Sequence, residues 1–177
     1  MERLDLSAYF RLPESTQPME LVYGVVREPP APRYGHQSIV TRLTVLLDDH
    51  IRPRSLGQVC VSPVDVVLDE HAPLVVQPDV VFVARDRMTI IRDRIWGPPD
   101  LVVEVLSTGT ASRDRTTKLA WYRRYGVGEC WLVDVRAHSV EVVPLGRTGQ
   151  RATFTGAAVA CSTVLTEWNV PTEQIFT

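Results

Sequence analysis

The chain has 177 residues, of which 45% are hydrophobic and 23% are charged, and its formal net charge is −2 at pH 7. This length and composition are typical of one soluble globular domain that is large enough to bury a core. The slightly acidic balance excludes binding to a polyanion through overall charge alone. A contact with nucleic acid must therefore rest on a local patch or on metal-bridged phosphates.

The N-terminus and the cysteines indicate the compartment. The first residues include acidic side chains and lack the apolar stretch of a signal peptide, and no segment is long enough to span a membrane. Cys60, Cys130 and Cys161 are odd in number and far apart, without the spacing of a Cys/His metal site. This pattern favours three reduced, mostly buried thiols. We therefore expect a cytoplasmic protein with no membrane segment.

The first third of the chain predicts a strand and a long helix. A polar lead-in of about 1–18 includes a short helical turn at 4–10. Residues 19–28 alternate as in a strand with an internal turn, and the proline-rich residues 29–33 stop it. Residues 36–51 place apolar side chains at helical spacing, which predicts an amphipathic helix packed on the core.

The middle of the chain predicts further strands that are interrupted by prolines. Residues 58–69 read as two strands with a kink at Pro63, and 74–84 as one strand that contains Pro78. A proline inside a strand indicates an edge, a bulge or the start of a strand. Residues 85–99 form an irregular, mildly basic excursion.

The last half of the chain alternates between predicted strands and a predicted helix, which indicates one α/β domain over 1–177. We expect a helix over about 112–125, with Ser112 as its N-cap and Gly126 just after its end. The expected strands are 100–107, 128–135, 138–145 and short segments around 151–161. The tail from 164 reads as a helical turn or a loop.

One carboxylate stands out within these elements. Glu104 interrupts the apolar run LVVEVL, which is rich in β-branched residues and typical of a strand buried on both faces. A carboxylate there is costly unless it is paired, hydrogen-bonded or bound to a cation. The residues alone leave two interpretations open: a metal ligand, or a buried salt bridge with an arginine or with Lys118.

Strand geometry selects the carboxylate that can join Glu104. Asp100 lies on the same face of that strand, but four residues at about 3.3 Å each place it roughly 13 Å away. Asp79, in QPDVVFV, lies on a separate strand that can fold beside the first. Two carboxylates suit Mg²⁺, because water and substrate phosphate oxygens fill the rest of its coordination shell. The alternative for Asp79 is a role in the turn into its strand.

The helix over 112–125 carries a possible catalytic cation. Lys118 has Asp114 one turn before it and Tyr122 one turn after it, on the same face. If the helix packs on the Glu104 strand, the ammonium can orient a water and offset charge on phosphate. The alternative is that Lys118 forms an ion pair with Asp114 on a solvent-exposed face of the helix. The aromatic residues of this region read as core or dimer contacts.

The motifs QPDVVFV, GPPDLVVEVLS and RDRTTKLAWYRRYGVGECWLVD, in this order, resemble the Uma-type restriction endonuclease family of the PD-(D/E)XK nuclease superfamily. The resemblance spans roughly residues 19–143. It implies a restriction-endonuclease-like α/β core, in which a mixed β-sheet is flanked by α-helices. It also implies hydrolysis of phosphodiester bonds.

The resemblance also implies the roles of individual residues. Asp79 and Glu104 match the metal ligands of the family, and the backbone carbonyl of Val105 adds a third oxygen to Mg²⁺ or Mn²⁺. Two residues after Glu104, where the superfamily pattern has lysine, this chain has Leu106. The family pattern moves that lysine to the following helix, here Lys118, which makes Lys118 the third catalytic residue.

Two further positions recur in the resembling family. Glu20 supplies a possible third carboxylate near the metal, and His36 a possible contact to phosphate or to a ligand. We therefore expect a metal-dependent endonuclease that acts on DNA as a homodimer. The alternatives are an inactive binding or scaffold module on the same fold and a metal-dependent hydrolase with another substrate.

Overall fold

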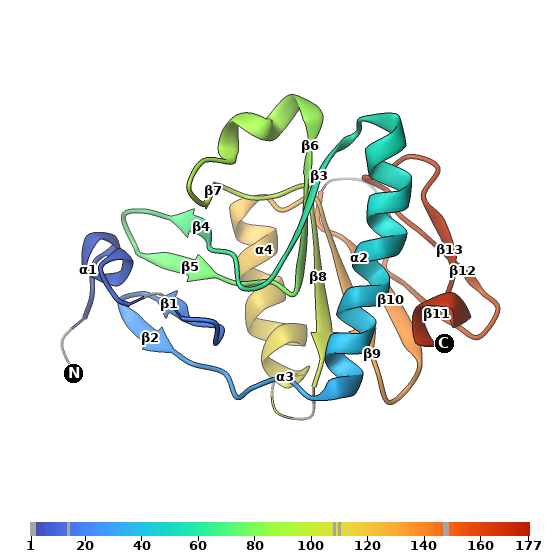
Figure 1. The fold of residues 1–177 in the computed structure, drawn as a ribbon, viewed down its shortest axis with the longest axis horizontal. Coiled ribbons are helices and arrows are strands. Elements are labelled where there is room, and N and C mark those ends of the chain that lie inside the picture. The colour runs from blue at the N-terminus through green and yellow to red at the C-terminus, as the bar shows by residue number, and fades with distance from the viewer. Residues whose placement is uncertain (1–2, 14, 108, 110, 147–148) are drawn as a thin grey trace.

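The computed structural model describes residues 3–13, 15–107, 109, 111–146 and 149–177, and its central element is a six-stranded mixed sheet (Figure 1). Its order is β11-β10-β9-β8-β6-β3, and its described pairs are antiparallel except for the parallel pair β8–β9. The strands are β3 (Gly57–Val61), β6 (Val80–Ala84), β8 (Leu101–Leu106), β9 (Glu129–Asp134), β10 (Ser139–Pro144) and β11 (Ala152–Thr155).

A second sheet of five strands has the order β2-β1-β5-β4-β7. Its strands are β1 (Glu20–Val22), β2 (Val25–Arg27), β4 (Val66–Asp69), β5 (Leu74–Val76) and β7 (Ile95–Trp96). Near the C-terminus, β12 (Val159–Cys161) and β13 (Asn169–Pro171) pair as a small antiparallel sheet. The β1–β2 hairpin confirms the predicted strand with a turn at Tyr23 and Gly24.

Helices lie on both faces of the larger sheet (Figure 1). The helical elements are α1 (Leu6–Phe10), α2 (Tyr34–Arg54), the 3₁₀ helix η1 (Arg85–Ile90), α3 (Ala111–Arg113), the π-helix η2 (Asp114–Lys118), α4 (Leu119–Tyr125) and α5 (Glu173–Phe176). Helix α2 packs its predicted apolar side against one face of the sheet. Helix α4 and the second sheet cover the other face. The predicted mixed sheet flanked by helices is confirmed.

The alternation of β8 decides which side chains meet each layer. Val103 and Val105 join the core under α2, whereas Val102 and Leu106 join the core under α4. The predicted burial of this strand on both faces is confirmed. Because side chains alternate along a strand, Glu104 points to the α4 side, between the two sheets.

The prediction of one strand over 74–84 is wrong. The segment forms β5 and β6, which belong to different sheets. Pro78 lies between them, and proline has no N–H to donate to a ladder, so the pairing breaks there. This break lets the chain cross from the second sheet to the first immediately before Asp79.

The helix predicted over about 112–125 is present as α3, η2 and α4, but it is not a regular α-helix. Its first residue is Ala111, whose N–H donates to the carbonyl of Ser107. Ser112 therefore lies inside α3, and its prediction as N-cap is wrong. A π turn over η2 then separates α3 from α4. Gly126 ends α4 with a φ of 90°, as its predicted position requires.

The cysteines are less buried than predicted. Cys130 lies in the core, but Cys60 and Cys161 are exposed because β3 is an edge strand and β12 belongs to the small peripheral sheet. All three are free thiols. Within the described ranges, no helix is long and apolar enough to cross a membrane.

Candidate functional site

Glu104 meets a lysine and a tyrosine in the space between the two sheets. Lys118 Nζ lies 2.8 Å from Glu104 Oε1 and 3.0 Å from Oε2, and the Tyr122 hydroxyl also donates to Oε1. Glu104 is 3% exposed, Lys118 5% and Tyr122 0%. The buried carboxylate therefore has the cationic and hydrogen-bonding partners that such a group requires.

The π turn helps to explain how Lys118 reaches this place. It ends at Lys118, and the following residues Leu119 and Tyr122 pack in the core beneath the sheet. A π turn adds a residue to one helical turn, rotates the side chains that follow, and is frequent at functional sites. Both Lys118 and Asp114 are buried. The alternative of a Lys118–Asp114 pair on a solvated face is therefore wrong.

Glu20 joins the same cluster from the second sheet. Lys118 Nζ lies 3.1 Å from Glu20 Oε1, and Arg113 Nη1 lies 2.7 Å from Glu20 Oε2. The backbone N–H of Gln77 also donates to Oε1 at 3.3 Å. Burial raises the pKa of Glu20, but the cations of Lys118 and Arg113 outweigh it and hold that pKa below its ordinary value. Lys118 thus bridges carboxylates of two different sheets.

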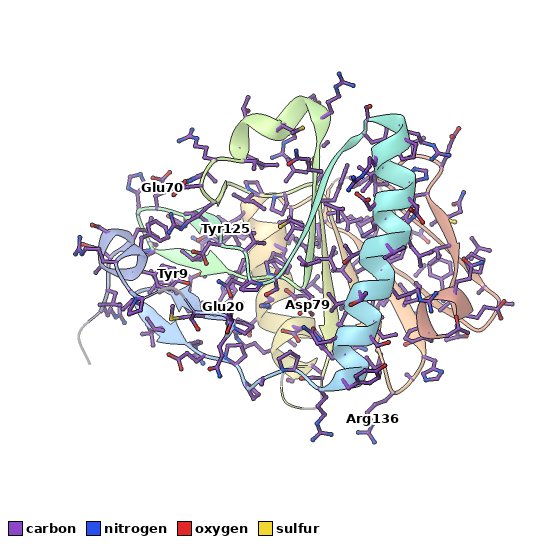
Figure 2. All side chains as sticks on the ribbon, viewed as in Figure 1. Tyr9, Glu20, Glu70, Asp79, Tyr125 and Arg136 are labelled. Carbon is purple, nitrogen blue, oxygen red and sulfur yellow. The ribbon has the colours of Figure 1, made fainter. Side chains whose placement is uncertain are left out.

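Asp79 forms the more exposed end of the cluster. Its Oδ2 accepts a hydrogen bond of 2.7 Å from the N–H of Val105, the residue after Glu104. The same oxygen lies 3.2 Å from His36 Nε2, at the start of α2. Figure 2 shows Asp79 close to the N-terminal half of α2. The side chain of Asp79 is 20% exposed, so solvent reaches the cluster at this end.

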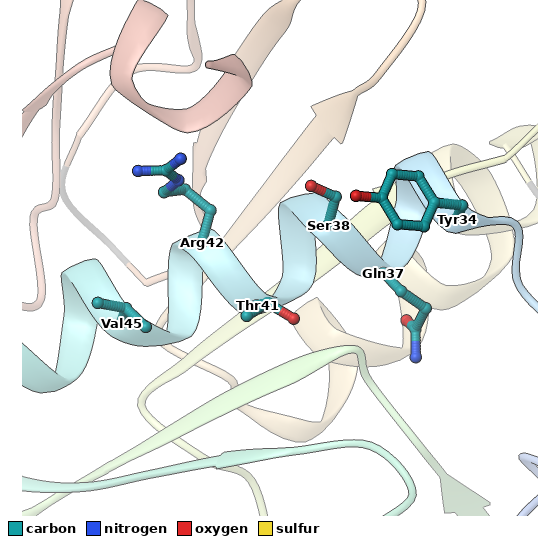
Figure 3. A pocket seen from close by; sticks show the side chains of 6 residues that line it. All are labelled: Tyr34, Gln37, Ser38, Thr41, Arg42 and Val45. Atoms are coloured by element: carbon teal, nitrogen blue, oxygen red, sulfur yellow. The ribbon is translucent and has the colours of Figure 1, made fainter.

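His36 connects Asp79 with the surface. Burial lowers the pKa of His36, but its hydrogen bond and charge interaction with Asp79 outweigh it and raise that pKa above the ordinary value. The other ring nitrogen lies 3.2 Å from Gln37 Oε1. Gln37 also lines a surface hollow of about 450 Å³ on the outer side of α2 (Figure 3). The hollow is lined by Tyr34, Gln37, Ser38, Thr41, Arg42 and Val45.

Asp100 does not join the cluster. Its carboxylate accepts a hydrogen bond of 2.8 Å from the N–H of Ala84 and pairs with Arg87 at 2.8 Å. These contacts fasten the beginning of β8 to the end of β6. The expectation that Asp100 and Glu104 do not cooperate therefore agrees with the structure.

Carboxyl groups outnumber basic side chains around Glu104. Burial raises the pKa of Glu104, the Lys118 ammonium opposes this rise, and the nearby carboxylates of Asp114 and Asp79 add to it. Burial lowers the pKa of Lys118, but the attraction of Glu104, Glu20 and Asp114 outweighs it, so that pKa is raised and the lysine stays protonated. The cluster thus contains the four carboxyl groups of Glu20, Asp79, Glu104 and Asp114 and the basic side chains of His36, Arg113 and Lys118.

This donor set fits a cation that needs few protein ligands. No three His, Cys, Asp or Glu side chains in the described part of the chain gather closely enough to hold a metal by themselves. Mg²⁺ needs only one or two carboxylates, since water and substrate phosphate complete its shell. In addition, the buried Oε2 of Glu20 makes an ion pair with Arg113 but has no hydrogen-bond donor within the described residues. A carboxylate oxygen offers about two lone-pair directions, so this oxygen can accept a further partner.

The structure adds two residues that the sequence analysis did not assign to the site. Tyr122 was interpreted as a core aromatic, although its position four residues after Lys118 placed it on the same helical face. Arg113 carried no signal, because its partner Glu20 is distant in sequence. The five predicted residues Glu20, His36, Asp79, Glu104 and Lys118 do gather, through the contacts given above.

Comparisons with known proteins agree with this fold. The chain matches the Uma2 family, described as "putative restriction endonuclease", over residues 6–173. It is also similar to a crystal structure from Anabaena variabilis, described as "a putative nuclease belonging to DUF820", with a TM-score of 0.82 and 17% identity. The alignment covers 98% of this chain and 97% of that one, and at such identity the likeness concerns the fold alone. No curated protein shows significant sequence similarity to the chain.

Proposed function

The chain belongs to the Uma2 restriction endonuclease family, as its motifs predict, and from this membership we propose that it is a metal-dependent endonuclease acting on DNA. The observation that carries the proposal is the contact of Asp79 with the backbone of Val105, beside Glu104. It brings the partly exposed carboxylate of Asp79, the residue before β6, next to a buried one from β8. Such a pair, supported by a lysine, suits the hydrolysis of phosphodiesters.

In this proposal, Asp79, Glu104 and the carbonyl of Val105 hold Mg²⁺ or Mn²⁺. The N–H of Val105 points to Asp79, and the N–H and C=O of one residue in an extended strand face the same neighbour. The carbonyl is therefore available on the side of Asp79. When bound, the cation supplies charge neutralisation at the scissile phosphate and lowers the pKa of a coordinated water.

Lys118, His36 and Glu20 stabilise charge on the phosphate or hold other groups of the site in position. The Lys118 ammonium, held against Glu104, offsets negative charge that develops on the phosphate and orients the attacking water. His36 lies at the solvent-reachable end and provides a hydrogen bond to a phosphate oxygen. Glu20 holds Lys118 from the opposite sheet. A single small domain that cuts both strands of a duplex is expected to act as two copies, so the proposal includes a two-fold homodimer.

One observation favours a second candidate, a binding or scaffold module without activity. Lys118 already donates to both carboxylate oxygens of Glu104, so the pair is stable without a metal ion. A hydrolase for another phosphodiester substrate would have the same site. Activity with several substrates separates these possibilities.

The test uses supercoiled, linear and single-stranded DNA with Mg²⁺, Mn²⁺ or EDTA. We expect cleavage of DNA that requires either cation, and its loss in Glu104→Gln, which keeps the side-chain shape but not the charge. Glu70→Gln is the matched control, because Glu70 is exposed on the turn after β4 (Figure 2). Absence of cleavage by the folded wild type in every combination, or full activity in Glu104→Gln, would contradict the proposal.

A further inference from the structure

Tyr122 places a hydroxyl group against the buried carboxylate of Glu104. The tyrosine is completely buried, and its ring packs in the core between α4 and the sheet. A phenylalanine would fill the same space, so packing alone does not require the hydroxyl. A buried hydroxyl needs a hydrogen-bond partner, and here the partner is Glu104 Oε1.

The donors are distributed unequally between the two oxygens of Glu104. Oε1 accepts from Tyr122 and from Lys118, whereas among the described residues the donor to Oε2 is Lys118, at 3.0 Å. A carboxylate offers about two lone-pair directions on each oxygen. The tyrosine therefore occupies Oε1 and, together with Lys118, restricts rotation of the group. Oε2 keeps the greater capacity for a further partner.

We propose that Tyr122 is a positioning residue, which orients the Glu104 carboxylate so that Oε2 is presented to a divalent cation. The proposal rests on the metal-dependent function proposed above. Groups that hydrogen-bond to metal-ligating carboxylates fix their orientation, and their removal typically weakens metal affinity or activity about 10- to 100-fold. Tyr122 does not touch the substrate and acts through Glu104.

Tyr125, one turn further along the chain, offers a matched control. Its hydroxyl donates to Asp69 Oδ2 at 2.9 Å, so it also forms a tyrosine–carboxylate pair. Asp69 belongs to β4, and its hydrogen-bond partners in the described residues are Tyr125 and the backbone of the turn that follows β4. Tyr125→Phe therefore removes a tyrosine–carboxylate hydrogen bond from the same helix, at a half-buried position, without a change at Glu104.

The experiment is a calorimetric titration of Mn²⁺ into the wild type, Tyr122→Phe and Tyr125→Phe, with DNA cleavage measured over a range of Mn²⁺ concentrations. We expect the dissociation constant for Mn²⁺ to rise about 10- to 100-fold in Tyr122→Phe. It should change less than about twofold in Tyr125→Phe. Excess Mn²⁺ should restore cleavage by Tyr122→Phe, with an unchanged KM for DNA.

The possible outcomes separate this inference from the proposed function. If the wild type binds Mn²⁺ and Tyr122→Phe binds it equally well, the positioning role is wrong while the nuclease proposal stands. A lower melting temperature with unchanged Mn²⁺ binding would likewise assign Tyr122 a structural role only. If the wild type neither binds Mn²⁺ nor cleaves DNA, both proposals fall. Should Tyr122→Phe not fold, Tyr122→Met also lacks the hydroxyl and allows the same comparison.

Discussion

Lys118 Nζ lies within 3.0 Å of both carboxylate oxygens of Glu104, although the two residues are 14 positions apart and come from a helix and a strand. The same nitrogen reaches Glu20 in the other sheet. One ammonium therefore contacts two buried acids and links η2, β8 and β1. Removal of the lysine and replacement of the whole pair should have different consequences, because an unpaired buried charge costs more than a neutral pair.

Lys118→Met tests this difference. The variant leaves Glu20 and Glu104 buried without their shared cation, and we expect the free energy of unfolding to fall by about 3–5 kcal/mol. The double variant Lys118→Met/Glu104→Gln also removes the uncompensated charge of Glu104, whereas Glu20 keeps its ion pair with Arg113, and it should recover part of the loss. Urea denaturation of wild type, single and double variants measures both values. A double variant less stable than Lys118→Met would show that the ion pair is not the source of the effect.

Asp79→Asn should separate activity from stability. The amide oxygen of asparagine can still accept from the N–H of Val105, so we expect stability within about 1 kcal/mol of the wild type. The anionic ligand is lost, so Mn²⁺-dependent cleavage should fall by at least about 100-fold. Thermal melting and DNA cleavage are the measurements.

Asp100→Asn is the matched comparison for Asp79→Asn. Asp100 also accepts a backbone hydrogen bond, but it pairs with Arg87 and lies outside the cluster. We expect Asp100→Asn to lower stability, because its partner Arg87 loses a charge-assisted bond, while the folded protein keeps its activity. Equal loss of activity in both variants would remove the distinction between a ligand and a structural carboxylate.

The strand around Glu104 could be predicted from the sequence because its physical signal is local. β-Branched residues on both sides of Glu104 permit a strand buried on two faces, and a single acid in such a run demands partners. The choice of Asp79 followed from strand geometry and from the resemblance to a nuclease family. Both residues lie together in the structure, connected through Val105.

The contacts between separate elements of the site were less accessible to prediction. Glu20 meets Lys118 because the second sheet packs against the helical segment that carries Lys118, and periodicity along the chain carries no information about which sheet a strand joins. The run 74–84 reads as one strand because its apolar pattern continues across Pro78. Spacing places Tyr122 on the helical face of Lys118, but neither its contact with Glu104 nor the π turn before it has a simple sequence signature.

Glu20 should make stability depend on pH in the acidic range. Its cationic neighbours lower its pKa in the folded protein below the ordinary value of 4.5. A carboxylate with a depressed folded pKa contributes stability that is complete above the unfolded pKa and is lost as pH falls through the folded pKa. We therefore expect the unfolding free energy of the wild type to decrease as pH falls below about 4.5.

Glu20→Gln removes this contribution and should flatten the acidic limb of the stability curve. Urea denaturation at intervals between about pH 7 and pH 3 measures the slope, which reports the difference in bound protons between the two states. Glu70→Gln, at an exposed position, should retain the slope of the wild type. Parallel curves for Glu20→Gln and the wild type would contradict the assignment of a depressed pKa.

Glu129 holds the C-terminal segment onto the large sheet through hydrogen bonds. It is completely buried, and its carboxylate accepts from Trp131 Nε1 at 2.8 Å, from Ser162 Oγ at 2.6 Å and from the Thr163 N–H at 2.7 Å. Trp131 donates to Oε1, whereas the Thr163 N–H donates to Oε2. Both nitrogen donors are fixed, unlike a hydroxyl that can rotate.

Glu129→Gln should therefore destabilise the protein whichever way its amide is turned. The new NH₂ group must face either the indole N–H of Trp131 or the backbone N–H of Thr163, and one buried donor loses its acceptor. The expected loss is about 1–3 kcal/mol in the free energy of unfolding, measured by urea denaturation. Glu70→Gln provides the exposed comparison and should change stability by less than about 0.5 kcal/mol. Equal stability of the two variants would mean that the segment around Thr163 is held by its apolar contacts rather than by Glu129.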